Sequence, residues 1–169
     1  QLVRQTNSSW DFVRWEGIDN DGDGRLNEDW VGGVDLNRNY GYAWNASCDI
    51  VGRNPEDGDY QGPESFSEPE TRAMRDLALA HHFSYALSFH SGTQYVTIPW
   101  MYTLDPTPDD SVLRQAASNV SSLVGLPYPP SSVLGPRSTV AGVWDDWMYG
   151  DCGTLALTCE IYGNSSALW

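Results

Sequence analysis

The chain has 169 residues, of which 40% are hydrophobic and 19% charged, as is typical of a globular domain rather than a disordered segment. Its 23 acidic and 9 basic residues give a formal net charge of -14, which disfavours nucleic acid and anionic membrane surfaces as partners. The sequence also lacks a run of about 18 apolar residues, so we expect neither nucleic acid nor a membrane among its partners.

Glycosylation sequons indicate the compartment, whereas the cysteines do not define a pairing. Four sequons of the form Asn-x-Ser, which are typical of secreted proteins, begin at Asn7, Asn45, Asn119 and Asn164. The three cysteines, Cys48, Cys152 and Cys159, are an odd number, so at least one is free or pairs outside this chain. We therefore predict a secreted or extracellular protein and leave the cysteine pairing open.

The first long segment, from Gly17 to Gly62, is rich in Gly, Asp, Asn and Pro and has little periodicity, which predicts long ordered loops. A compact domain seldom carries so much loop without a functional reason. Within it, Asp19, Asp21 and Asp23 alternate with small residues, as in the first half of a calcium-binding loop. The acid expected at the twelfth position of such a loop is absent, so a calcium site and a merely acidic turn are both open.

The remaining elements follow in order. A helix is predicted over residues 68–80, with Ser67 and Glu70 forming a capping box. Apolar and β-branched runs predict strands at 85–89 and 95–98, and a further helix, which begins near Pro108, is expected to stop at Gly125. A short helix at 144–149 then leads into a strand at 154–160.

This alternation of strands and helices predicts one α/β domain over residues 1–169, with a mixed, mostly parallel sheet flanked by helices. In such sheets, ligands bind beyond the carboxyl ends of the strands. His90 follows one predicted strand and Glu160 ends another, so we expect both side chains to face the same site.

Arg38 lies between two amide side chains, Asn37 and Asn39, in a polar loop. A planar guanidinium beside an amide is well shaped to bind a free carboxylate through two parallel hydrogen bonds. An ordinary loop in which Arg38 pairs with a neighbouring acid is the alternative.

Five segments of the chain resemble the zinc carboxypeptidase family, in the same order along the sequence. They are Gly33 to Tyr40, Gly62 to Thr71, Ser88 to Gly92, Asp145 to Tyr149, and Thr158 to Ile161. The resemblance implies a zinc-dependent enzyme that releases C-terminal amino acids from peptides or proteins by attack of an activated water.

The resemblance also assigns roles. It implies that Asn37 and Arg38 hold the C-terminal carboxylate of the substrate, that His90 is one zinc ligand, and that Glu160 is the general base. Arg4 falls where the family keeps an arginine that stabilises the oxyanion. Asp145 falls at the base of the pocket for the C-terminal side chain, which implies a preference for Lys or Arg unless Asp145 points away or caps the short helix.

The sequence departs from the family in two places. The other zinc ligands of the family come from a His-x-x-Glu motif on the N-terminal side of these segments, and this sequence contains no such motif. We therefore expect a domain that is incomplete at its N-terminal side, inactive alone, and completed by an upstream segment. In addition, Ser138 aligns with a tyrosine that closes over substrate in the family. A non-catalytic, calcium-stabilised module that binds peptide C-termini is the alternative function.

Overall fold

The computed structural model describes residues 33–55, 57–91, 94–126 and 138–161, together with the backbone of two short strands. These are β1 (Leu2–Gln5) and β2 (Trp10–Arg14), which pair antiparallel. Asp19, Asp21 and Asp23 lie outside the described residues, so the predicted calcium loop stays a prediction. Among the described residues, no helix is long and apolar enough to cross a membrane.

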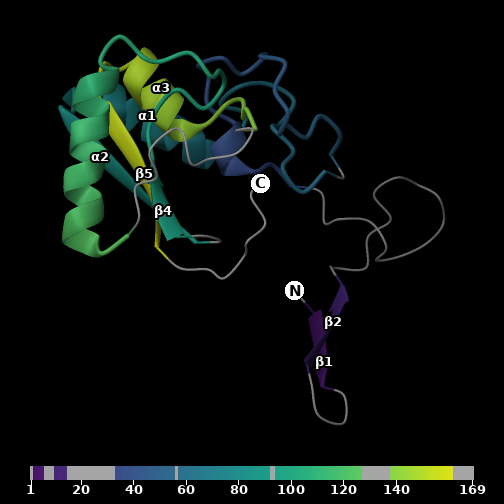
Figure 1. Cartoon of the computed structure of the whole chain (residues 1–169). Coiled ribbons are helices and arrows are strands. Elements are labelled where there is room, and N and C mark those ends of the chain that lie inside the picture. The colour runs from purple at the N-terminus through teal and green to yellow at the C-terminus, as the bar shows by residue number, and fades with distance from the viewer. Residues whose placement is uncertain are drawn as a thin grey trace.

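The second sheet has three strands in the order β3, β5, β4, of which Figure 1 labels β4 and β5. Strand β3 (Tyr85–His90) runs parallel to β5 (Leu155–Ile161), and β4 (Gln94–Thr97) pairs with the other edge of β5 in the antiparallel sense. The predicted α/β fold with a mixed sheet is therefore confirmed. The register places His90 directly opposite Glu160 at the carboxyl ends of β3 and β5.

Successive side chains of β5 point to opposite faces of the sheet. Because apolar side chains occur on both faces, helices cover both of them. On one face, Leu157 and Cys159 pack with Leu113 and Ala117 of helix α2 (Asp110–Val124). On the other face, a second cluster contains Ala156 together with residues of helices α1 (Pro69–His81) and α3 (Trp144–Gly150). Figure 1 shows β5 between α2 on one side and α1 with α3 on the other.

The helix ends are only partly those predicted. Helix α2 ends at Gly125, whose φ of 71° is in the left-handed region that glycine favours. The capping box at the start of α1 is wrong, because Glu68 is the N-cap residue and no side chain caps the helix. Instead, the hydroxyl of Ser67 accepts a hydrogen bond from the buried amide of Asn39 and donates one to the Glu68 carboxylate, each at 2.8 Å.

Asn39 is fully buried and ties the loop before α1 to the single turn of 3-10 helix η1 (Leu36–Arg38). Its amide nitrogen donates to the carbonyl oxygens of Gln61 and Glu64, each at 2.9 Å, as well as to Ser67. Its side-chain oxygen accepts hydrogen bonds from the backbone N–H of Glu68 and the hydroxyl of Thr71. The loop that carries η1 is therefore held rigidly against α1.

Candidate active site

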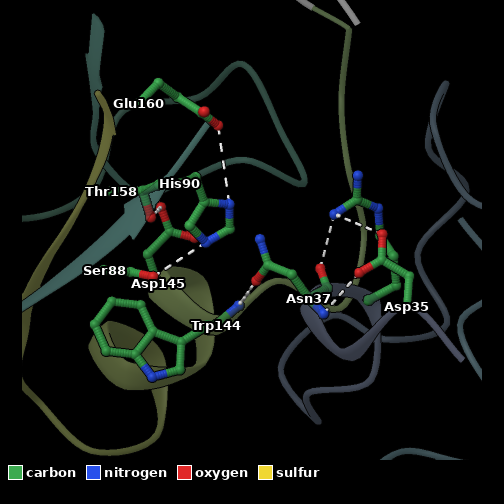
Figure 2. A network of polar contacts seen from close by, with 9 residues as sticks. Asp35, Asn37, Ser88, His90, Trp144, Asp145, Thr158 and Glu160 are labelled. Atoms are coloured by element: carbon green, nitrogen blue, oxygen red, sulfur yellow. Dashed lines mark hydrogen bonds and ion pairs between the residues drawn. The ribbon is translucent and has the colours of Figure 1, made fainter. Parts of the chain in front are cut away.

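His90 and Glu160 lie side by side, because β3 and β5 are parallel neighbours and both side chains stand at their carboxyl ends. Nδ1 of His90 is 3.9 Å from Oε1 of Glu160 (Figure 2). On the other side of the ring, Nε2 is 3.0 Å from the hydroxyl oxygen of Ser88. This contact fixes the imidazole plane, so that Nδ1 faces the Glu160 carboxylate.

Glu160 has the environment of a proton acceptor. Burial raises the pKa of its carboxyl group, and the neighbouring His90 opposes this shift. Oε2 is buried and has no hydrogen-bond partner among the described residues. A carboxylate with a raised pKa and one unpartnered oxygen is suited to general-base chemistry near neutral pH.

Helix η1 presents a second group of polar side chains. Its N-cap residue is Asp35, whose Oδ1 accepts a hydrogen bond of 2.9 Å from the backbone N–H of Asn37. The side-chain oxygen of Asn37 in turn accepts one of 2.9 Å from the backbone N–H of Trp144, at the start of α3. In Figure 2, Asn37 lies between Asp35 and the residues at the strand ends.

The guanidinium of Arg38 keeps capacity for a ligand. Nη1 donates to the backbone carbonyl of Asn37 at 2.8 Å and is 3.9 Å from Oδ2 of Asp35. Nε is buried and has no hydrogen-bond partner among the described residues. Arg38 therefore pairs with the neighbouring acid Asp35 only at 3.9 Å. Its unpartnered N–H groups are left to bind a substrate carboxylate.

Asp145 lies in the first turn of α3 and is buried. Oδ2 accepts a hydrogen bond of 3.4 Å from the hydroxyl of Thr158 on β5. Figure 2 shows Asp145 beside Thr158 and close to the His90 ring, so it points towards the strand ends. Burial raises the pKa of Asp145, and backbone N–H groups at the helix start and the nearby His90 oppose the shift.

Residues Thr139 to Asp146, which we call the pocket segment, connect these groups. The segment contacts η1 so closely that a Cβ atom at Gly142 would lie 2.1 Å from the carbonyl oxygen of Arg38. The backbone N–H of Tyr40 also donates to the carbonyl of Gly142 at 2.9 Å. Asn37, Arg38 and Asp145 are therefore parts of one packed unit.

Two further aspartates hold the pocket segment, and sequence reasoning gave neither a role. The Asp49 carboxylate accepts hydrogen bonds from the backbone N–H and the hydroxyl of Thr139. The Asp146 carboxylate accepts from the backbone N–H groups of Met101 and Tyr102. Burial raises the pKa of Asp146 well above its usual value, with a contribution from the neighbouring Asp145. Two adjacent acids at the start of a buried helix were the available signal for Asp146.

The role of Arg4 and that of the position aligned with the closing tyrosine stay predictions. Arg4 lies in β1, and its side chain is outside the described residues. Ser138 is half-buried, and residues 127–137 before it lie outside the described residues, so a nearby tyrosine in this role and a missing contact are both alternatives.

The described residues fit part of a zinc site. Nδ1 of His90 is available as a ligand nitrogen beside the Glu160 carboxylate. Among residues 33–55, 57–91, 94–126 and 138–161, no three His, Cys, Asp or Glu side chains are grouped to hold a metal. A complete zinc site therefore needs further ligands from residues outside these ranges.

The comparisons with known proteins agree on one family. The model of the zinc carboxypeptidase family matches residues 2–167. Carboxypeptidase B of Astacus astacus is 35% identical over 138 residues, which cover 76% of this chain and 44% of that protein. Carboxypeptidase A1 of Rattus norvegicus is 29% identical over 136 residues, which cover 76% of this chain and 32% of that protein.

A solved structure of a related protein has the same fold. Bovine thrombin-activatable fibrinolysis inhibitor, in a complex with tick carboxypeptidase inhibitor, superposes with a TM-score of 0.64 at 25% identity. The match covers 76% of this chain and 45% of that one. The chain thus spans less than half the length of these relatives.

Proposed function

The chain belongs to the zinc carboxypeptidase family, and we propose that the complete protein is a zinc-dependent metallocarboxypeptidase that releases C-terminal amino acids from peptides. The observation that carries this proposal is the contact between His90 and Glu160 at the strand ends, next to the unit that contains Asn37, Arg38 and Asp145. A module that only binds peptide C-termini would need Asn37 and Arg38 but not His90 and Glu160.

Each group has a chemical task in this reaction. Asn37 and Arg38 bind the terminal carboxylate, so the scissile bond lies at a fixed distance from the chain end. Bound zinc would polarise the scissile carbonyl and lower the pKa of the attacking water. Glu160 accepts the proton of that water at its unpartnered oxygen and passes it to the leaving amine. Arg4 stabilises the developing oxyanion.

His90 is one zinc ligand, and we expect the others from an upstream segment of the same protein. Two features of β3 support this expectation. Among the described residues, β3 pairs with β5 alone, and its side chains Tyr85, Leu87 and Phe89 are 62%, 45% and 61% exposed. A strand added in parallel at this open edge would end beside His90, and its following helix would cover the apolar side chains.

The test uses the complete, zinc-loaded protein and peptides that differ only at the C-terminus. Peptides with a free carboxylate should lose single residues stepwise, as followed by mass spectrometry, and the same peptides with a C-terminal amide should not react. An Arg38→Ala variant should raise KM for free-acid peptides. Cleavage of the amidated peptides at internal bonds, or no cleavage by the folded zinc-loaded protein, would refute the proposal.

We further propose that Asp145 gives a preference for Lys or Arg at the C-terminus. A carboxylate buried at the base of a pocket is stabilised by a substrate cation. Matched peptides that end in Arg and Leu, tested with Asp145→Asn alongside, decide this point. Equal kcat/KM on both peptides, unchanged in the variant, would reject the preference and leave the peptidase assignment standing.

Two further inferences from the sequence complete the proposal. Asp19, Asp21 and Asp23 form a calcium loop that stabilises the fold, as their spacing suggests. The protein is secreted, which the four sequons support.

A further inference from the structure

Asp146 is an acid without a part in the proposed chemistry, yet both oxygens of its carboxylate accept hydrogen bonds from backbone N–H groups. It is fully buried. Oδ1 accepts a hydrogen bond of 2.8 Å from the backbone N–H of Met101, and Oδ2 accepts one of 3.0 Å from the N–H of Tyr102. Burial of a carboxylate is costly unless it is hydrogen-bonded, so this arrangement indicates a strong geometric requirement at this position.

The backbone of Met101 makes a second contact with the pocket segment. The N–H of Val140 donates to the carbonyl oxygen of Met101 at 2.9 Å. Both ends of the pocket segment are therefore fastened to Met101, one through the main chain and one through the Asp146 side chain. The segment cannot move past residues 101–102 without breaking both connections.

Asp145 and Asp146 are neighbours on α3 but point in different directions. Successive residues of an α-helix are separated by about 100° around the axis. While Asp146 faces the amides of residues 101–102, Asp145 faces Thr158 at 3.4 Å. Since α3 has only seven residues, its own hydrogen bonds hold its first turn weakly, and side-chain contacts determine how that turn is rotated.

We propose that Asp146 is a positioning residue for substrate specificity: it sets the rotation of the first turn of α3, so that Asp145 faces the substrate side chain. This inference rests on the proposed function of Asp145. It assigns the two adjacent acids separate tasks, one towards the substrate and one towards the fold.

The test compares Asp146→Asn, Asp145→Asn and the double variant in the complete protein, with peptides that end in Arg and in Leu. In Asp146→Asn, one amide N–H of residues 101–102 meets a donor instead of an acceptor, so the first turn shifts. We expect kcat/KM on the Arg peptide to fall about tenfold, mainly through KM, with a much smaller change on the Leu peptide. In the Asp145→Asn background, the second substitution should change both peptides equally.

Asp151→Asn is the matched control, because it removes an acid from the exposed C-terminal end of the same helix and should leave the Arg/Leu ratio unchanged. The ratio does not depend on the fraction of protein that folds, so a partial folding defect leaves the test intact. Should Asp146→Asn not fold at all, Asp146→Glu keeps the charge, displaces the carboxylate by one methylene and is expected to lower the same ratio.

Two results would overturn the inference. An Arg/Leu ratio that falls in Asp145→Asn but not in the Asp146 variants refutes the positioning role and leaves the specificity proposal intact. A ratio that does not change even in Asp145→Asn refutes both, because Asp145 then has no specificity to be positioned.

Discussion

Gly142 is the position where a single added methyl group should separate the pocket segment from η1. Its φ is +68°, in the left-handed region, and a Cβ atom there would lie 2.1 Å from the carbonyl oxygen of Arg38 and 2.8 Å from the carbonyl carbon. The left-handed conformation alone costs a non-glycine residue about 1–2 kcal/mol. Relief of the clash adds about 1–3 kcal/mol, as is typical of overpacked positions.

The functional effect follows from the size of the required shift. A carbon and a carbonyl oxygen in contact are about 3.3 Å apart, so the two backbones must separate by roughly 1 Å in the Gly142→Ala variant. Misplacement of that size costs up to about 10²-fold in rate. We expect kcat/KM of the complete protein to fall by about one to two orders of magnitude, because the Trp144 N–H moves away from Asn37 and the carbonyl of Arg38 is displaced.

Gly153→Ala provides the matched control. Gly153 has nearly the same φ, +67°, but nothing lies within 4 Å of the Cβ position. This variant should lose a similar 1–2 kcal/mol of stability to the backbone conformation and keep its kcat/KM within about twofold. Two results would refute this prediction: an equal loss of kcat/KM in both variants, or a Gly142→Ala variant as active as the parent protein. Either would show that the contact between the pocket segment and η1 does not contribute to activity.

Three further predictions concern stability and metal binding. Asn39→Ala should lower the free energy of unfolding by about 3 kcal/mol or more, because the hydrogen bonds of a fully buried side-chain amide are lost, whereas the exposed Asn45→Ala should change it by less than about 0.5 kcal/mol in denaturant titration. The 169-residue chain alone should retain no stoichiometric zinc after dialysis against a mild chelator, since His90 lacks grouped partners in the described part of the chain; retained zinc would contradict this. Millimolar Ca²⁺ should raise the thermal midpoint of the folded protein, and an unchanged midpoint would favour the acidic turn.

The sequence predicted those parts of the site that depend on strand ends. His90 and Glu160 each follow an apolar run, and two parallel neighbours bring their carboxyl ends to one edge, so their proximity needed only the assignment of two strands. The clamp residues Asn37 and Arg38 were found through their local composition and their resemblance to a family.

What the sequence did not predict depends on contacts between distant segments. Asp146 reaches the amides of residues 101–102, and Gly142 fits against Arg38, but no local pattern marks either partner. The capping box failed for the same reason: Ser67 has the composition of a cap, but the amide of Asn39, 28 residues earlier, engages its hydroxyl. A local propensity is overridden when a buried polar group needs that partner.

The most direct test of the central claim is the kinetics of Glu160→Gln in the complete, zinc-loaded protein. The substitution removes the general base and leaves the shape of the site, so kcat on peptides with a free C-terminus should fall by about 10²- to 10⁴-fold or more while substrate still binds. A variant that retains near-normal kcat would show that Glu160 does not accept the proton, and the proposed carboxypeptidase mechanism would be contradicted.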